Sequence, residues 1–476
     1  MIVAATLRNC DAARRKCITA DAAVYSYADP RRPGAAEHAD ACDGDRHRAG
    51  KGGASVAKAI ELGELAGRVL VSGMPNMLLR ALCLMSLLSL FGFAQPARAD
   101  EGAFVIGIMN DQSGPYADLS GPSSVEAVRM AIEDSGGTVL GKKIELLVAD
   151  HQNKVDVGMA IARQWYEERG VTTIFDITNS GVALALQGLA KSHNRLVVFD
   201  SASSSDLTGK SCSPYTMQWN ADNWSNGVSL MRLLIKQKLD SFFFITADYA
   251  FGASLEADAR DAIAKAGGTT IGGVRAPLNT ADFSSYLLSA QASHAKVVVL
   301  ANTGADLSTS LKQANEFGVA PAQYIATPIT YLSDVNAMGL AIAHDLTFMQ
   351  SWYWDLNDAT RAWAKRFYAR TNRMPNDNQA VLYSSVRHYL EAVAKAGTDD
   401  ALTVAKAMRE APIHDVFTDD GRIREDGRVV YDRYLMRVKT PTESKYPWDY
   451  LTVVAKIPAE EAFRPPGAGG CALGVP

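Results

Sequence analysis

Residues 104–121 read FVIGIMNDQSGPYADLSG, and this stretch decides the fold. Phe104–Met109 is a short apolar run without helical periodicity, which is typical of a strand buried on both faces. A polar loop, Asn110–Tyr116, follows it, and Gly121–Ser123 (GPS) opens a helix. Open α/β sheets hold small molecules with this unit, because free backbone N–H groups point out of the helix start. We therefore expect the loop to form one wall of a ligand site.

The same unit recurs along the chain, in two halves separated by a break at residues 213–226. Strands are predicted at Lys143–Asp150, Thr173–Ile177, Leu196–Phe199, Ser241–Thr246, Thr269–Val274, Val297–Ala301 and Gln323–Ala326. Helices are predicted at Val155–Glu168, Ser180–His193, Gly252–Ala266, Phe283–His294 and Ala305–Phe317. The βαβ order predicts mostly parallel sheets with helices on both faces. Two similar α/β lobes follow, and 476 residues suffice for both.

After about residue 347 the pattern changes to long helices and antiparallel strands. The helices are predicted at Asp358–Thr371, Gln379–Ala396 and Ala401–Arg409, and the strands at Arg428–Val438 and Thr452–Ile457. Residues 464–476 are rich in Pro and Gly, which predicts an irregular tail.

The composition is that of an ordinary soluble globular protein, with 47% hydrophobic and 21% charged residues. The formal net charge is −4, so no basic surplus points to nucleic acid or an anionic membrane as a partner.

Residues 74–99 have the three parts of a secretory signal peptide. Met74–Arg80 carries one positive charge, Ala81–Phe93 is an uncharged apolar core, and Ala97–Ala99 gives the small–x–small pattern of a cleavage site. The apolar core is too short to span a bilayer, and a buried core helix is the alternative interpretation. We expect export to the periplasm with cleavage after Ala99.

Residues 1–73 precede this signal and contain few large apolar residues before Ile60. They cannot bury much of a core, so we expect either a disordered extension or a non-native one. In the second case translation starts at Met74 or Met77.

Cys212 and Cys471 are the two cysteines that remain after the expected cleavage. An oxidising compartment favours a disulfide that ties the tail to the loop near Cys212. Two free thiols are the alternative, because the sequence does not place the two residues within bridging distance.

Motifs for catalysis and cofactor binding are missing from the sequence. Gly136–Lys143 nearly matches a phosphate-binding loop, but Lys143 stands where Ser or Thr must hold magnesium. Gly467–Ala472 fits a dinucleotide fingerprint loosely, yet it lies in the tail. There is no H-E-x-x-H, paired C-x-x-C or G-x-S-x-G, and no general base stands near the serine-rich loop. We expect no enzymatic activity, no cofactor and no metal.

Small hydroxyl residues and glycines follow several of the predicted strands. They lie at Asn179–Gly181, Ser201–Ser205, Thr303–Gly304 and Thr327–Pro328. Such groups bind a carboxylate without a full counter-charge. Helix capping explains any one of these loops equally well, but four of them at strand ends favour a ligand site.

Aromatic residues in the loops supply the apolar half of a pocket. Tyr116 lies in the first loop, Trp219 and Trp224 at the break, and Tyr249 and Phe251 after the first strand of the second half. Core packing is the alternative, and it suits Trp224 best. The other loop aromatics, beside polar residues and glycines, favour a binding wall.

The motifs GIMNDQSGPYA (Gly107–Ala117), ADYAFG (Ala247–Gly252) and DFSSYL (Asp282–Leu287) carry a resemblance to a known family. From about Phe104 to Ile457 the chain resembles the type I periplasmic solute-binding proteins of ABC importers, the branched-chain amino-acid-binding family.

The resemblance implies two Rossmann-like lobes joined by three crossovers, near Asp222, Gln350 and Val430, that close over a ligand like a hinged clamp. The implied N-terminal lobe contains residues 100–222 and about 351–430. The C-terminal lobe then contains residues 223–350 and about 431–463, followed by the tail.

The resemblance also implies how a ligand is held. Ser180, Ala202 and the pair Ser203–Ser204 would bind its carboxylate, while Tyr249 or Phe251 and Thr303 would close from the second lobe. The full set of candidate ligand-binding residues is Tyr116, Asn179, Ser180, Ala202, Ser203, Ser204, Trp219, Tyr249, Phe251, Thr303, Gly304 and Thr327.

Amino-acid-binding members of that family often hold the ligand ammonium with an acidic side chain after a late strand. Here Ala326–Asp334 (ATPITYLSD) has no acid at the matching place, and Asp306 is either a substitute or a helix-start residue. An aromatic or short aliphatic acid and a branched-chain amino acid both stay open as ligands.

The function implied is that of a monomeric periplasmic binding protein that delivers its solute to a membrane permease and, through it, to an ATPase. A ligand sensor with the same clamp, for an amide, urea or an amino acid, is the alternative.

Overall fold

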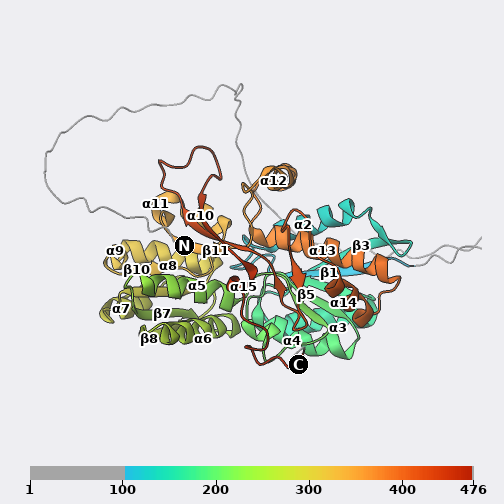
Figure 1. The fold of residues 1–476 in the computed structure, drawn as a ribbon, viewed down its shortest axis with the longest axis horizontal. Coiled ribbons are helices and arrows are strands. Elements are labelled where there is room, and N and C mark those ends of the chain that lie inside the picture. Colours follow the sequence, from blue (N-terminus) through green and yellow to red (C-terminus); the bar gives the residue numbers. More distant parts are fainter. Residues whose placement is uncertain (1–101, 474–476) are drawn as a thin grey trace, which may run out of the picture. The chain divides into compact units, whose positions relative to one another are not determined.

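The computed structural model describes residues 102–473 (Figure 1). The predicted N-terminal extension, residues 1–73, and the predicted signal peptide, residues 74–99, lie outside these residues. Within the described part of the chain, no helix is long and apolar enough to cross a membrane.

The first sheet has six strands in the order β2-β3-β1-β4-β5-β6. Its strands are β1 (Phe104–Asn110), β2 (Thr138–Val139), β3 (Lys142–Asp150), β4 (Thr173–Asp176), β5 (Leu196–Phe199) and β6 (Thr216–Gln218). All pairs are parallel except β2 with β3. The central strands β4 and β5 are buried throughout, as continuous apolar runs require, whereas β3, nearer the sheet edge, is mostly half-buried or exposed.

Helices cover both faces of this sheet. They are α2 (Gly121–Asp134), α3 (Val155–Glu168), α4 (Ser180–Ser192), α12 (Asp358–Thr371), α13 (Asp377–Ala396) and α14 (Ala401–Glu410), with the short 3-10 helix η2 (Ser205–Thr208). Ile106 and Ile108 pack with α2 and α13, while Met109 packs with α3 and α4 on the opposite face (Figure 1). We call this sheet and these helices the first lobe.

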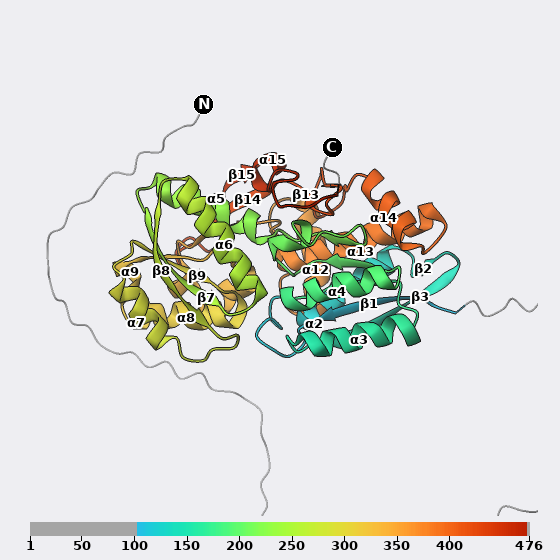
Figure 2. The ribbon, with the colours of Figure 1, turned by 90° about the horizontal axis from the view of Figure 1, so that it is seen from below.

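The second sheet has four parallel strands in the order β10-β9-β7-β8. Its strands are β7 (Ser241–Ala247), β8 (Thr269–Ala276), β9 (Val297–Ala301) and β10 (Tyr324–Ala326). Its helices are α5 (Asn223–Lys236), α6 (Ala250–Lys265), α7 (Ser284–Ala292), α8 (Gly304–Glu316), α9 (Val319–Ala322), α10 (Leu332–Met338) and α11 (Leu340–Ala343). Figure 2 shows this second lobe beside the first.

A third, antiparallel sheet, β11-β14-β15, follows the second lobe in sequence. The remaining elements are β11 (Thr347–Gln350), β12 (Arg422–Ile423), β13 (Val429–Val430), β14 (Arg433–Val438), β15 (Leu451–Ile457) and α15 (Ala459–Ala462). The predicted two-lobed α/β architecture with mostly parallel sheets is confirmed, and the residue boundaries of the lobes stay a prediction.

Two local predictions were wrong. The predicted single strand Arg428–Val438 is divided into β13 and β14. The buried Arg428 guanidinium instead donates to the backbone oxygens of Gln218 and Asn220, beside β6. The predicted break at residues 213–226 contains strand β6 and the start of α5, whose N-terminus is capped by Asp222.

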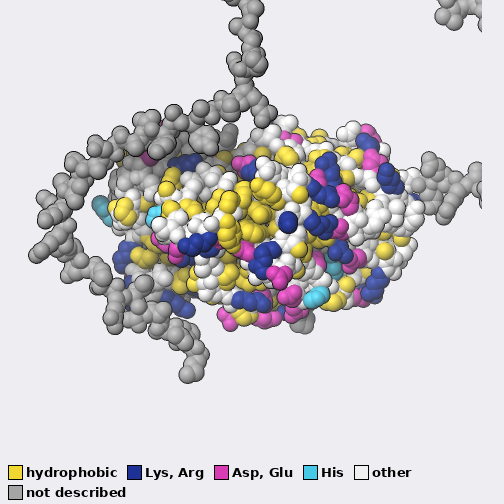
Figure 3. Space-filling view, turned by 90° about the horizontal axis from the view of Figure 1, so that it is seen from above, with side chains coloured by type: hydrophobic (Ala, Val, Ile, Leu, Met, Phe, Trp, Pro, Cys, Tyr) yellow, Lys and Arg dark blue, Asp and Glu magenta, His cyan; other side chains and the backbone are white. Residues whose placement is uncertain are grey.

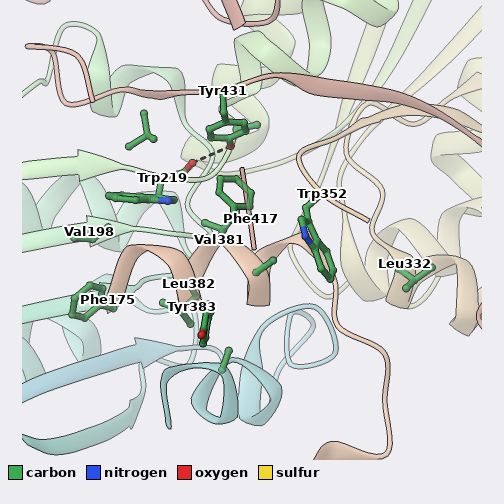
Figure 4. Close-up of a cluster of buried hydrophobic side chains, with 14 of the residues drawn as sticks. Phe175, Val198, Trp219, Leu332, Trp352, Val381, Leu382, Tyr383, Phe417 and Tyr431 are labelled. Atoms are coloured by element: carbon green, nitrogen blue, oxygen red, sulfur yellow. Dashed lines mark hydrogen bonds between the residues drawn. The ribbon is translucent and has the colours of Figure 1, made fainter. Parts of the chain in front are cut away.

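A dense aromatic cluster joins the first sheet to the C-terminal segments (Figure 4). Trp219 is fully buried there, and the Tyr431 hydroxyl donates to its backbone oxygen at 2.9 Å. Phe417 packs edge-on against Tyr431 with ring centroids 4.7 Å apart. The cluster fixes the chain between β6 and α5, where the first lobe passes into the second.

The surface mixes both charges, and Figure 3 shows basic and acidic side chains side by side on one face. Ion pairs link α12 to α2, among them Arg366 with Asp134 and Arg370 with Glu133, each at 2.7 Å. Exposed pairs of this kind each stabilise by roughly 0–1 kcal/mol. Together they help to hold α12 against α2 on the first lobe.

Cys212 and Cys471 form a disulfide with their Cα atoms 5.6 Å apart. The tail that carries Cys471 also contacts the first lobe through Arg464, whose Nη2 donates to the backbone oxygen of Ser205 at 2.9 Å. Of the two alternatives for the cysteines, the structure therefore has the bonded one.

Candidate ligand site

A small cavity, about 10 Å³ in volume, lies where loops at the strand ends of the two lobes meet. The first lobe lines it with Tyr116, Leu119, Thr178, Ser201 and Ser203, and the second lobe with Tyr249, Phe251, Thr303, Ile329 and Tyr331. Five of the predicted site residues are therefore brought together: Tyr116, Ser203, Tyr249, Phe251 and Thr303. The space holds about one water, so a solute enters only when the lobes part.

The loop after β1 is shaped by Asp111. Its two carboxylate oxygens accept hydrogen bonds from the backbone N–H of Gly114 at 2.7 Å and of Tyr116 at 2.8 Å. Asn153 adds a bond from its Nδ2 to the same carboxylate at 2.6 Å. These contacts hold the loop that carries Tyr116, whose side chain lines the cavity.

Tyr116 meets Tyr249 across the cavity, with the two hydroxyl oxygens 2.7 Å apart. Burial, reinforced by the neighbouring phenol, raises the pKa of Tyr116 well above its ordinary value, and burial also raises the pKa of Tyr249. Both phenols therefore stay neutral, and each offers a donor and an acceptor.

Gly304 lets the lobes approach closely beside this pair. Its φ of +64° is one that glycine adopts readily, and a Cβ there would lie 2.7 Å from the backbone oxygen of Pro115. The next residue, Ala305, donates its N–H to that same oxygen at 3.1 Å. The predicted site residue Gly304 therefore lies at the contact between lobes and not in the cavity wall.

Hydroxyl groups form the polar part of the first-lobe wall. Ser203 Oγ accepts from Asn220 Nδ2 at 3.0 Å and donates to the backbone oxygen of Ser201 at 3.2 Å. Thr178 Oγ1 accepts the backbone N–H of Asp111 at 3.2 Å. Ser201 donates its hydroxyl to the buried carboxylate of Asp176.

The second-lobe wall is largely apolar and aromatic. Phe251, in the first turn of α6, stacks at a tilt on Tyr249 with centroids 5.7 Å apart. Thr303 is the N-cap residue of α8, and among the described residues its hydroxyl has no hydrogen-bond partner. The positive end of the α8 dipole and one free hydroxyl therefore face the cavity.

The structure places the other predicted residues outside the cavity wall. Asn179 caps α4 by accepting from two backbone N–H groups, Ser204 caps η2, and Ser180 accepts the N–H of Ser204 at 3.3 Å. The capping alternative thus describes this loop. Ala202 and Thr327 are buried and bond through their backbone oxygens, to Gln218 Nε2 and Thr330 Oγ1 respectively.

Trp219 is also outside the cavity wall, because its ring belongs to the aromatic cluster of Figure 4. Its indole packs 5.3 Å from the His388 ring, measured between centroids. A Trp between two lobes resembles a binding residue in sequence, but here the chain needs a large apolar side chain to fill the junction.

Sequence reasoning missed Leu119, Thr178, Ser201, Ile329 and Tyr331 as cavity residues. Two of them stood beside predicted positions: Thr178 precedes Asn179, and Ser201 begins the serine run. Ile329 and Tyr331 follow the predicted loop Thr327–Pro328, but they are apolar or aromatic where the sequence pattern pointed to hydroxyl and acidic side chains.

A second contact between the lobes lies away from the cavity. Ser205 of η2 donates two hydrogen bonds to helix α6 of the second lobe: its N–H donates to Ser254 Oγ at 3.1 Å, and its hydroxyl donates to Asp258. Burial raises the pKa of Asp258 to about 7, although the Ser205 hydroxyl and Arg464 oppose the shift.

Acidic groups near the cavity are engaged elsewhere. Asp306 lies in the first turn of α8, which fits its interpretation as a helix-start residue. It accepts the backbone N–H of Asn279 at 3.1 Å, and burial raises its pKa to about 6. Asp334 caps α10 by accepting the Tyr331 N–H at 2.9 Å. Among residues 102–473, no group of three or more His, Cys, Asp or Glu side chains could hold a metal.

Comparisons with known proteins agree with this geometry. The chain is 41% identical to a periplasmic binding protein from Burkholderia mallei, over 78% of this chain and 99% of that one, with a TM-score of 0.77. It is 39% identical to a branched chain amino acid ABC transporter periplasmic ligand-binding protein from Burkholderia xenovorans, over 78% and 99% of the two chains, with a TM-score of 0.69.

A curated relative is more distant. Leu/Ile/Val-binding protein homolog 6 from Brucella abortus is 24% identical over 215 residues, which are 45% of this chain and 53% of that protein. The chain therefore matches about half the length of this curated relative.

Two α/β lobes that close their strand ends over one cavity define a solute-binding protein of the clamp type. The sequence model of the periplasmic binding proteins matches residues 104–445. The chain belongs to this family, in its branched-chain amino-acid-binding branch, whose members bind substrates and are not enzymes.

Proposed function

We propose that this protein is the solute-binding component of an ABC importer and captures a small carboxylate-bearing solute between its lobes. The observation that carries the proposal is the cavity lined from both lobes, with hydroxyl groups on one side and aromatic rings on the other. A wall from each lobe makes solute binding depend on closure, which is how a clamp reports that it is loaded.

The cavity chemistry supports a carboxylate. Among the described residues that line it, none carries a positive charge, so an anion must be held by neutral donors. The free Thr303 hydroxyl at the N-terminus of α8 is one such donor, and the phenol pair Tyr116 and Tyr249 supplies another.

Two solute classes fit this wall. The rings of Tyr116, Tyr249, Phe251 and Tyr331 suit an aromatic acid. A branched-chain amino acid suits the same apolar surface, and the relative from B. xenovorans is described as a ligand-binding protein of a branched-chain amino acid transporter. We expect a monomer that is exported to the periplasm and delivers the solute to a permease and its ATPase.

Calorimetric titration of the purified protein tests the proposal. We expect at least one of L-leucine, L-phenylalanine, 4-methylpentanoate, benzoate and 4-hydroxybenzoate to bind in the micromolar range or tighter and to raise Tm by mass action, without turnover. Binding by none of them, or conversion of a bound compound, would contradict it.

Variants locate the binding event. Tyr116→Phe removes the hydrogen bond between the Tyr116 and Tyr249 hydroxyls and should lower the affinity for the titrated solute roughly fivefold to tenfold. Tyr446→Phe makes the same change at an exposed tyrosine that bonds Asp355, and it should leave affinity unchanged.

A further inference from the structure

We infer that Asp176 makes the first-lobe wall selective for solutes that carry a hydrogen-bond donor, an ammonium or a hydroxyl group, in addition to their carboxylate. This inference rests on the proposed function and narrows its solute class. Asp176 does not line the cavity and acts through Ser201, so it is a positioning residue.

Asp176 ends strand β4 directly behind the cavity and is fully buried. Asn110 Nδ2 and Ser120 Oγ both donate to its Oδ2 at 2.8 Å, and Ser201 Oγ donates to its Oδ1. Three side-chain donors on one carboxylate hold it as an acceptor on both oxygens. No Lys, Arg or His is among these partners.

The backbone at this place is also unusual. Asp176 has a φ of +75° and the following Ile177 a φ of +56°, a conformation that a β-branched residue rarely adopts. Thr178, the next residue, lines the cavity. The strained backbone of Asp176 and Ile177 thus lies directly behind the ligand wall, at the buried carboxylate.

A second buried acid, Asp200, lies beside Asp176 and has fewer donors. Its Oδ2 accepts the backbone N–H of Asp176 at 3.0 Å, while among the described residues its Oδ1 has no partner. Burial, and after it the charge of Asp176, raises the pKa of Asp200 well above its ordinary value. Burial also raises the pKa of Asp176, but the hydroxyls of Ser201 and Ser120 and the amide of Asn110 oppose that shift. The three donors on Asp176 therefore favour its carboxylate form, whereas Asp200, with one backbone donor, is the member of the pair more strongly biased toward the acid form.

Ser201 links the Asp176 carboxylate to the cavity. Because its only proton is donated to Asp176, its oxygen can only accept toward the cavity. Ser203 has likewise donated its proton, to the Ser201 backbone oxygen. The serine part of the first-lobe wall therefore presents acceptors beside the buried Asp176 carboxylate, whereas the Thr303 hydroxyl, unpartnered among the described residues, lies on the second lobe.

A solute placed between these walls needs an acceptor at one end and a donor at the other. Its carboxylate accepts hydrogen bonds at the α8 side, and its donor group donates to the Ser201 oxygen. An otherwise identical solute without that donor leaves the Ser201 oxygen unpaired and the Asp176 charge without a compensating dipole.

Matched solute pairs test the inference by calorimetry. L-leucine and 4-methylpentanoate differ by the amine, and 4-hydroxybenzoate and benzoate differ by the hydroxyl. In at least one pair we expect the donor-bearing member to bind roughly tenfold to hundredfold tighter to the wild-type protein.

Asp176→Asn keeps the shape of the side chain but removes its charge, and its new amide can donate to Ser201 and turn the hydroxyl proton toward the cavity. The affinity ratio should then fall to within about threefold of unity. Ser201→Ala should lower the ratio similarly, and it keeps the test open if the first variant does not fold. Ser203→Ala is the control, which should weaken both members without changing their ratio.

The possible outcomes distinguish a failure of the selectivity inference from a failure of the proposed function. A ratio near one in every pair that binds, or a preference for the donor-free member, overturns the selectivity and leaves the proposed function standing. A wild-type ratio that survives in Asp176→Asn, with folding confirmed by circular dichroism, assigns the selectivity elsewhere and overturns the role of Asp176. Absence of binding by these four compounds and by L-phenylalanine overturns the proposed function together with the inference.

Discussion

The two walls of the cavity are built differently. On the first lobe, the hydroxyls are held by hydrogen bonds that leave little freedom: Ser201 donates to Asp176, Ser203 donates to the Ser201 backbone oxygen, and Thr178 accepts the Asp111 N–H. On the second lobe, the wall consists mainly of the rings Tyr249 and Phe251 and the side chains Ile329 and Tyr331.

This difference indicates a division of labour. The side chains of a fixed polar network are already ordered before the solute binds, so binding costs little further conformational entropy. Such a network can select and orient a polar group of the solute. Covering an apolar wall with solute is favourable because apolar surface is removed from water, and this contribution does not depend on the direction of the contact. The first lobe therefore selects, and the second lobe closes.

The first-lobe wall should depend on the disulfide, because Cys212 follows η2 and the tail that carries Cys471 also bonds Ser205. The double variant Cys212→Ser/Cys471→Ser should lose about 3–5 kcal/mol of unfolding free energy, since the bond closes a loop of 259 residues. Urea unfolding measures the loss. A variant as stable as the wild type would show that the tail does not hold this wall.

The second-lobe wall should depend on ring volume. Phe251→Ala removes a buried ring and should cost about 3–4 kcal/mol of stability, together with affinity for any solute. Phe251→Leu keeps most of the volume and should cost less than half of that. If both variants bind the solute as the wild type does, the ring serves folding only.

Gly304→Ala should oppose closure itself. The positive φ costs about 1 kcal/mol in both open and closed forms, but the clash with the Pro115 backbone exists only when the lobes are closed. Affinity should therefore fall roughly tenfold.

Gly318→Ala is the matched control, because its φ of +69° is similar and nothing lies within 4 Å of its Cβ position. It should lose similar stability and keep its affinity. Equal affinity loss in both variants would show that strain, and not contact between the lobes, is responsible.

The smallest effect concerns pH and the Ser205–Asp258 contact. In the closed form burial raises the pKa of Asp258 to about 7, whereas in an exposed carboxylate it is near 3.9. The closed form thus binds a proton more tightly, so its stability falls as pH rises from about 4 to 7 and is constant above. Solute affinity should decline by severalfold over that window.

Asp258→Asn should flatten this part of the affinity profile. Asp261→Asn, on the same helix and in an exposed pair with Lys265, should leave the profile as it is in the wild type. Calorimetry at pH 5, 6, 7 and 8 decides between them. A profile unchanged in Asp258→Asn would assign the pH dependence to Asp306, Asp334 or other groups.

The fold followed from the sequence where local signals agreed. The apolar runs that became β4, β5 and β9 are buried throughout, and helix α3 begins and ends at the predicted residues. The sequence pattern did not predict elements that depend on tertiary contacts. Strand β6, for example, is three residues long and forms because it pairs with β5 and bonds Gly427.

The sequence predicted which loops carry the site but not which residues of those loops reach the cavity. Serine-rich and asparagine-rich loops were expected at the strand ends, but Asn179 and Ser204 cap helices while Ser201 and Ser203 reach the cavity. One-residue differences in side-chain direction separate these roles, and sequence alone does not fix them. Asp176 was missed because a buried acid at a strand end has no sequence signature.

Hydrogen exchange measured with and without a solute that binds in the calorimetric screen tests the central claim most directly. If the solute is held between the two walls, amide protection should rise together in residues 111–119 and 201–205 of the first lobe and in residues 249–255 and 327–332 of the second. Protection confined to one lobe, or located away from these segments, would contradict the account.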